Sequence, residues 1–142
     1  MASNLYNPGL EKLLDGTISF ESDTINVLLV DASHTFDKTH EFVSDIVANE
    51  ASGTGYARKT LANAAIALDA ANDRVEFDAD NPSYTALDAG TIAAAIIFKQ
   101  VTNDADSPLI AQIDFADLVT NGSDVELQIN SEGLFFVTNN IT

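Results

Sequence analysis

The stretch that decides the fold runs from Thr91 to Gln100 and reads Thr-Ile-Ala-Ala-Ala-Ile-Ile-Phe-Lys-Gln. Its three alanines would suit a helix on intrinsic propensity alone. We predict a strand instead, because the apolar run is short, because Gly90 precedes it, and because β-branched residues flank the alanines on both sides. The other strands are predicted from the sequence before and after this run.

Further strand signals lie on both sides of this run. We expect strands at residues 17–20, 24–31, 56–61, 64–69, 74–78, 108–115, 125–129 and 134–137, with a tight turn at 71–73. Residues 24–31 are mostly apolar and typical of a buried strand. The alternation in residues 108–115 predicts that Leu109, Ala111, Ile113 and Phe115 face one way, and Val125, Leu127 and Ile129 alternate in the same manner.

Two short helices are expected before most of these strands. The first begins at Asn7 as N-cap with Pro8 at the first helical position, and it ends at Gly16. The second is predicted over residues 37–47, with Asp37 as its cap. The fold class that follows is mainly β: an antiparallel β-sandwich or jelly-roll-like domain with two short helices near the N-terminus.

The length of 142 residues suits one domain. A chain of this size buries enough surface to fold without a disulfide or a structural metal. Residues 1–6 show no periodicity and are interpreted as an N-terminal arm, which leaves residues 7–142 as a single β-sandwich domain.

The charge balance restricts the partners. Six basic and 22 acidic residues give a net charge of −16. Such a surface repels phosphate backbones, so we expect no binding to nucleic acid or to anionic membranes. The absence of cysteine excludes thiol catalysis, and the N-terminus has no features of a signal peptide.

Candidate chemistry is sparse. His34 and His40 lie in no nucleophile signature, and the loop Gly53-Thr54-Gly55 lacks the lysine and the context of a phosphate-binding loop. We interpret that loop as a tight turn whose glycines adopt positive φ. The acidic segment from Asp69 to Asp80 fails the EF-hand pattern, which leaves a solvated acidic rim or a calcium site built from several strands. We predict no catalytic residue, no cofactor, no resident metal and no enzyme. The alternative of a small hydrolase would need a pocket holding a pair of groups with shifted pKa values.

Several stretches, taken in order, resemble a family of small virion proteins of tailed bacteriophages. They cover most of the chain from about residue 5 to 137, and no single one is specific by itself. They are residues 13–16 (Leu-Leu-Asp-Gly) with 23–30 (Asp-Thr-Ile-Asn-Val-Leu-Leu-Val); 39–42 (Thr-His-Glu-Phe) with 50–56 (Glu-Ala-Ser-Gly-Thr-Gly-Tyr); 60–63 (Thr-Leu-Ala-Asn) with 69–80 (Asp-Ala-Ala-Asn-Asp-Arg-Val-Glu-Phe-Asp-Ala-Asp); and 107–115 (Ser-Pro-Leu-Ile-Ala-Gln-Ile-Asp-Phe).

The resemblance implies a structural protein of the phage particle. A capsid decoration or cement protein on the outer capsid surface is expected, bound to the major capsid protein as a homotrimer. The alternative is a structural or host-adhesion module of the neck, tail or head fibre, because similar small β-proteins occur there. No catalytic residue is implied by the resemblance.

The N-terminal arm supplies the candidate contact residues. Leu5 and Tyr6 are an apolar and an aromatic side chain with no partner implied inside the domain. One interpretation is a frayed end or a lid on the domain; the other is a contact with a neighbouring subunit or the capsid.

Overall fold

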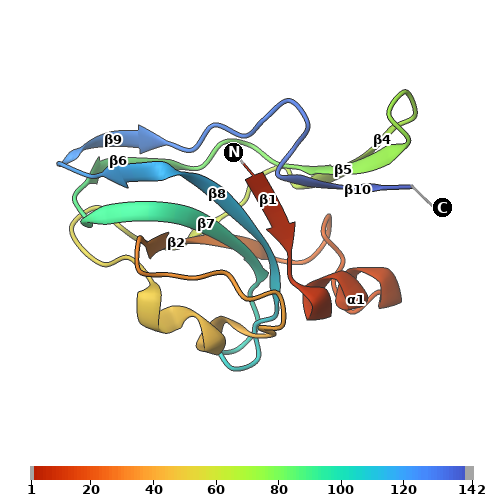
Figure 1. The fold of residues 1–142 in the computed structure, drawn as a ribbon, viewed down its shortest axis with the longest axis horizontal. Coiled ribbons are helices and arrows are strands. Elements are labelled where there is room, and N and C mark those ends of the chain that lie inside the picture. Colours follow the sequence, from red (N-terminus) through yellow and green to blue (C-terminus); the bar gives the residue numbers. More distant parts are fainter. Residues whose placement is uncertain (1, 140–142) are drawn as a thin grey trace.

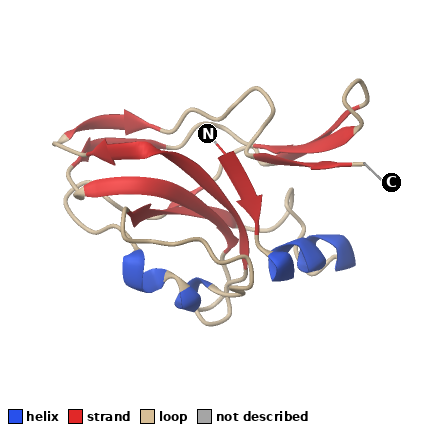
Figure 2. Ribbon diagram, viewed as in Figure 1, coloured by secondary structure: helices blue, strands red, loops and turns tan. Residues whose placement is uncertain are grey.

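Antiparallel strands are the main regular elements of the structure, a computed structural model that describes residues 2–139 (Figure 2). Strands hold 46% of the residues and helices 11%, so the prediction of a mainly β fold is confirmed. The elements in chain order are β1 (Ala2–Leu5), α1 (Asn7–Asp15), β2 (Ile25–Asp31), the 3-10 turns η1 (Val43–Asp45) and η2 (Val47–Asn49), β3 (Lys59–Thr60), β4 (Ala65–Asp69), β5 (Arg74–Asp78), β6 (Ser83–Leu87), β7 (Thr91–Lys99), β8 (Leu109–Val119), β9 (Ser123–Glu126) and β10 (Phe135–Thr138).

A five-stranded sheet in the order β1-β8-β7-β2-β3 forms the centre of the molecule (Figure 1). The strand prediction for the alanine-rich run is confirmed, since β7 is the middle strand. Ala95 and Ile97 point to one face, while Ala94 and Ile96 point to the other, and all four are buried. A strand covered on both faces carries apolar residues at consecutive positions, which explains why the run does not alternate.

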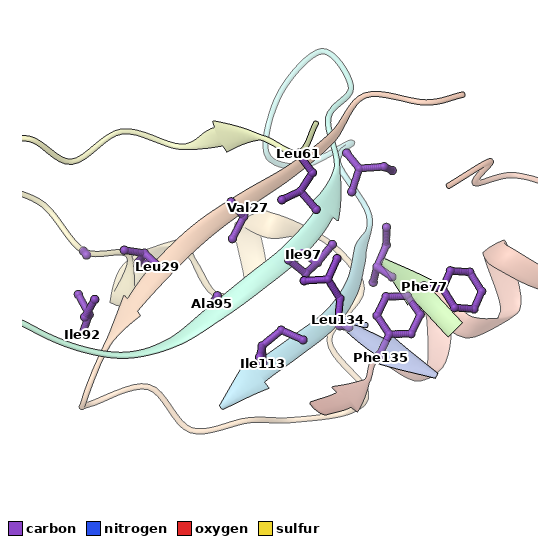
Figure 3. Close-up of a cluster of buried hydrophobic side chains, with 14 of the residues drawn as sticks. Val27, Leu29, Leu61, Phe77, Ile92, Ala95, Ile97, Ile113, Leu134 and Phe135 are labelled. Atoms are coloured by element: carbon purple, nitrogen blue, oxygen red, sulfur yellow. The ribbon is translucent and has the colours of Figure 1, made fainter. Parts of the chain in front are cut away.

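The first core lies between the large sheet and two smaller sheets, β10-β5-β4 and β6-β9. Figure 3 shows Val27, Ile97 and Ile113 of the large sheet in one buried cluster with Phe77 and Phe135 of the small sheet β10-β5-β4. Phe77 and Phe135 stack with ring centroids 4.5 Å apart. These aromatic rings therefore connect the small sheet β10-β5-β4 to the main core.

The second core covers the opposite face of the large sheet. Leu28, Ile96 and Phe98 pack there against Val43 and Ile46, which lie in the loop that carries η1 and η2. The helix predicted over residues 37–47 is therefore wrong: the same apolar spacing serves two 3-10 turns.

Side-chain hydrogen bonds explain why this helix does not form. The Asp45 carboxylate accepts the backbone N–H groups of Glu41 and Phe42 at 2.9 and 3.0 Å, and the Asp37 carboxylate accepts that of Thr39 at 2.9 Å. Such local bonds offer the backbone an alternative to helical hydrogen bonds. The same two N–H bonds lower the pKa of Asp45.

A bulge in β8 corrects a second prediction. Ile97 pairs with Ala111 but Phe98 pairs with Leu109, so Ile110 is an extra residue in the ladder. The bulge reverses the facing, and Leu109 packs into the second core while Ala111 and Ile113 pack into the first. Leu109 therefore does not share a face with Ala111 and Ile113 as predicted.

Other boundaries differ from the sequence prediction in detail. No strand forms at residues 17–20, although Ile18 and Phe20 are buried, and the strand predicted at 56–61 shrinks to β3. Strand β9 ends at Glu126, yet Leu127 and Ile129 still alternate and pack on the first core. Strand β6, which pairs with β9, was not predicted.

Helix α1 forms where the sequence predicted it. Tyr6 rather than Asn7 is its N-cap, and Gly16 ends it with φ of +84°. Gly9 faces β8 so closely that a Cβ at this position would lie 2.2 Å from the carbonyl oxygen of Leu109. The helix is therefore held against the large sheet at one backbone contact that only glycine permits.

Candidate functional site

An apolar groove between α1 and the sheet β10-β5-β4 is the candidate functional site. Figure 1 shows the helix and this sheet beside one another, with the β4–β5 hairpin projecting from the molecule. The groove has a volume of about 570 Å³. Its lining is mostly apolar and comes from three segments: Leu10, Leu13 and Leu14 of α1; Gly16, Ile18, Ser19, Phe20 and Glu21 of the following loop; and Ile66, Val75, Phe77 and Val137 of the sheet.

The register of the small sheet explains why one of its faces is apolar. Ile66 lies opposite Phe77 and Leu68 opposite Val75, and β10 places Val137 opposite Val75 on the other side. Directly paired residues in a sheet share a face, so these side chains form one continuous apolar surface.

The exposed fraction of the side chains increases along this apolar surface. Phe77 is 8% exposed and packs edge-on to Phe20, whereas Ile66 is 41% and Leu68 76% exposed. On the other wall of the groove, Leu14 is 78% exposed. Contiguous apolar surface of this kind on a soluble protein is typical of an interaction site.

The opposite face of the small sheet is polar and acidic. The Arg74 guanidinium forms ion pairs with Asp69 (3.1 Å), Glu76 (2.8 Å) and Glu132 (3.6 Å). It also lies 4.6 Å from the ring centroid of Phe136. Three carboxylates thus share one cation, which leaves this face with excess negative charge.

The helical wall of the groove is tied to the rest of the molecule at two points. Lys12 Nζ donates to Glu41 Oε1 at 2.7 Å, and Gly9 packs against β8 as described above. Because the wall is fixed, the groove is a preformed feature rather than one that must open.

The structure corrects the interpretation of the N-terminal arm, residues 1–6, as a segment without a partner in the domain: residues 2–6 have partners there, and Met1 lies outside the described residues. Strand β1 pairs with the edge of β8, with Leu5 opposite Ala111. Tyr6 is fully buried in the second core, its ring centroid 4.9 Å from that of Phe36. Burial raises the pKa of the Tyr6 hydroxyl, whose oxygen has no hydrogen-bond partner among the described residues.

Leu5 and Tyr6 therefore contribute to the fold itself, and Tyr6 presents no surface to a neighbour. The sequence Ala-Ser-Asn-Leu has neither alternation nor β-branched residues, so nothing local marks it as a strand. Its structure depends on β8, which lies about a hundred residues further along the chain.

The two histidines, which precede the 3-10 turns η1 and η2 in the chain, engage different partners. His34 Nε2 lies 3.0 Å from Gln112 Oε1, and burial lowers the pKa of His34. His40 Nε2 lies 3.9 Å from Asp37 Oδ2. Both side chains thus contact neighbouring polar groups of the fold.

The carboxylates of the segment from Asp69 to Asp80 are distributed over separate contacts. Asp69 and Glu76 bind Arg74, Asp80 Oδ2 accepts the Asn63 amide at 2.7 Å, and Asp78 Oδ1 accepts the N–H of Ala79. Within residues 2–139, no group of three His, Cys, Asp or Glu side chains is placed to hold a metal ion.

The loop Gly53-Thr54-Gly55 is a tight turn, as predicted. Gly53 has φ of +150° and Gly55 of +77°. A Cβ on Gly55 would lie 2.5 Å from the carbonyl oxygen of Ala86, so the loop packs backbone against backbone beside β6.

Comparison with known proteins identified no relative. No family model matches the chain, and neither a curated protein nor a solved structure shows significant similarity. None of the helices in the described part of the chain has the length and apolar character needed to cross a membrane.

Proposed function

We propose that this chain is a non-enzymatic structural protein of a tailed-bacteriophage virion. In this proposal it is a decoration or cement protein that binds the major capsid protein on the outer capsid surface, as a homotrimer, and stabilises the shell. The packing of two small sheets over the large one fits the β-sandwich class expected for such a domain.

The observation that carries the proposal is the open apolar groove beside the β4–β5 hairpin. Leu14 and Leu68 leave most of their apolar surface in water, and contiguous exposed apolar surface is typical of a face that a partner covers in an assembly. The stretches that resemble small virion proteins of tailed bacteriophages suggest that this assembly is a phage particle. The net charge of −16 favours the outer face of a shell over contact with packaged DNA.

The charge also constrains how copies meet. Neighbouring subunits repel each other at −16, so a trimer must rest on apolar contacts or on basic surfaces of the shell. Increasing salt should therefore weaken the capsid contact if basic capsid residues dominate it, and strengthen the trimer if self-repulsion dominates.

Quantitative mass spectrometry of virions whose genome encodes the chain tests the proposal. A copy number comparable to that of the major capsid protein is expected. A copy number far below it contradicts decoration and supports the neck, tail or fibre, whereas absence from the particle contradicts a virion role altogether. Tight binding of the purified protein to duplex DNA at physiological salt contradicts the assignment to the outer face.

A further inference from the structure

Strand β4 is the free edge of the small sheet. Among residues 2–139 it pairs only with β5, in the sheet order β10-β5-β4. The N–H of Ile66 donates to Glu21 Oε1 at 2.9 Å, so this group points away from β5. In an antiparallel pair, residues two apart direct their backbone groups to the same side. Leu68 therefore directs its N–H and C=O outward as well, in line with the outer boundary of the groove.

The usual protection against strand pairing is slight at this edge: the Glu21 carboxylate holds the Ile66 N–H, and an added strand displaces it. Natural edge strands carry lysine, proline or a bulge, or a loop covers them. Strand β4 reads Ala-Ile-Ala-Leu-Asp, pairs with β5 without a register shift, and exposes Ala65 to Leu68. An edge of this kind accepts an added strand through its backbone groups.

The two faces of β4 differ in what they would offer to such a strand. Ile66 lines the apolar groove and Leu68 lies on the same face of the sheet, while Ala67 and Asp69 lie on the acidic face with Glu76 and Asp78. An added strand alternates its side chains between these faces. The complementary sequence therefore alternates apolar residues, which enter the groove, with basic residues, which meet the acidic face.

The charge of the site argues against a second copy of this chain as the occupant. The β4–β5 hairpin carries Asp69, Asp73, Glu76 and Asp78 against the single cation Arg74, and Glu21 lines the groove. A second hairpin would bring the same excess of negative charge, and like charges across a strand pair are destabilising.

We propose that the edge of β4 and the adjoining groove bind an extended segment of a partner protein in which basic and apolar residues alternate, added as a fourth strand of the small sheet. The inference rests on the proposed function only in that the partner is then a virion protein. The binding of an added strand is inferred from the edge of β4, its exposed Leu68 and the acidic face.

A panel of short acetylated peptides that alternate lysine with valine, leucine or isoleucine tests this in solution. We expect at least one peptide to bind saturably and to slow hydrogen exchange of the Leu68 amide, measured by NMR, by about tenfold or more. Peptides of the same composition with the lysines in one block, and peptides with glutamate in place of lysine, are the controls; they should leave this amide unprotected.

Variant Leu68→Pro removes the outward N–H and leaves the inward ladder bonds to β5 in place, because proline is tolerated at such edge positions. We expect it to keep the wild-type melting temperature and to weaken peptide binding by about tenfold or more. The matched variant Leu68→Ala keeps the N–H and should bind better than Leu68→Pro.

Three results overturn the proposal. The first is that no peptide of the panel protects the Leu68 amide, and the second is that peptides with all lysines in one block protect it equally. The third is that the chain forms dimers that Leu68→Pro abolishes, which makes a second copy the occupant. Failure of the proposed function is distinguishable, since absence from virions leaves the peptide result standing. Full copy number in virions of the Leu68→Pro variant contradicts the use of this edge in the particle while leaving a virion role intact.

Discussion

The large sheet and the small sheet β10-β5-β4 use similar apolar residues to different ends. In β7 the apolar run is buried on both faces, and Ile96 is completely inaccessible. In β4, Ile66 and Leu68 alternate with alanine in an equally apolar strand, yet Leu68 is 76% exposed. The comparison teaches that the apolar residues of β7, in the middle of the large sheet, are buried in the core, whereas those of β4, at the edge of the small sheet, are left available for contact.

The largest expected effect is the difference in stability lost when one apolar side chain is truncated in each sheet. Ile96→Ala removes a side chain from the second core and should lower the free energy of unfolding by about 3 kcal/mol. Leu68→Ala should change it by less than about 0.5 kcal/mol, because the side chain is mostly in water. Urea unfolding of both variants measures the difference, and comparable losses would contradict the assignment of Leu68 to an open surface.

The contact that joins the groove to the large sheet should have the next largest effect. Gly9→Ala places a Cβ against the Leu109 carbonyl oxygen and forces α1 away from β8, at a cost of about 2 kcal/mol or more. Gly16→Ala is the control: it has open space around it and only the strain of φ at +84°, so it should cost about 1 kcal/mol. Thermal unfolding ranks the two, and the reverse order would show that α1 is not held at Gly9.

Ion pairs extend the comparison to polar residues. Arg58 donates to Glu50 and to Asp104, both at 2.7 Å, beside the large sheet, and its hydrogen bonds hold the pKa of Asp104 below its usual range. Arg58→Met should cost about 1–2 kcal/mol, a figure reduced from that of a fully buried pair because solvent screens the partly exposed groups. Arg74→Met in the small sheet should lower the free energy of unfolding by less than Arg58→Met. Chemical denaturation measures both variants, and an equal or greater loss for Arg74→Met would contradict the expectation that the ion pairs beside the large sheet contribute more to stability.

The smallest expected effect is the contribution of His34, on the side of the large sheet, to the pH dependence of stability. Burial lowers the pKa of His34, with His40 adding to this shift and Gln112 and Asp31 opposing it. The unfolded state then binds the proton more readily, so His34 should reduce stability as pH falls through about 6.5. Urea unfolding at neutral and mildly acidic pH should show a weaker loss for His34→Gln than for the wild type; identical losses would contradict the role of His34.

The parts of the fold that sequence could predict are those with local signals. Strands β2, β5 and β7 follow from runs of β-branched and apolar residues, and the β4–β5 hairpin follows from its turn. Helix α1 was marked by Pro8 and Gly16. In each case the chemistry that forms the element lies within the element.

The parts that sequence could not predict depend on distant segments. Tyr6 is buried because β8 supplies an edge for β1, and Leu109 changes face because Ile110 forms a bulge against β7. The groove exists because β10, near the end of the described chain, returns to pair with β5. Only the alternation of Ile66 and Leu68 with alanine, in a strand without lysine or proline, was a local signal of the exposed edge.

Hydrogen–deuterium exchange of residues 65–69, read by mass spectrometry on the free protein and on purified virions, tests the central claim most directly. The claim is that the open edge and groove of the small sheet are the face that a partner covers. The account predicts that the outward amide of Leu68 exchanges rapidly in the free protein and that the β4 peptide gains protection in the particle, while peptides from β7 stay protected in both. Equally rapid exchange of β4 in the virion would contradict it.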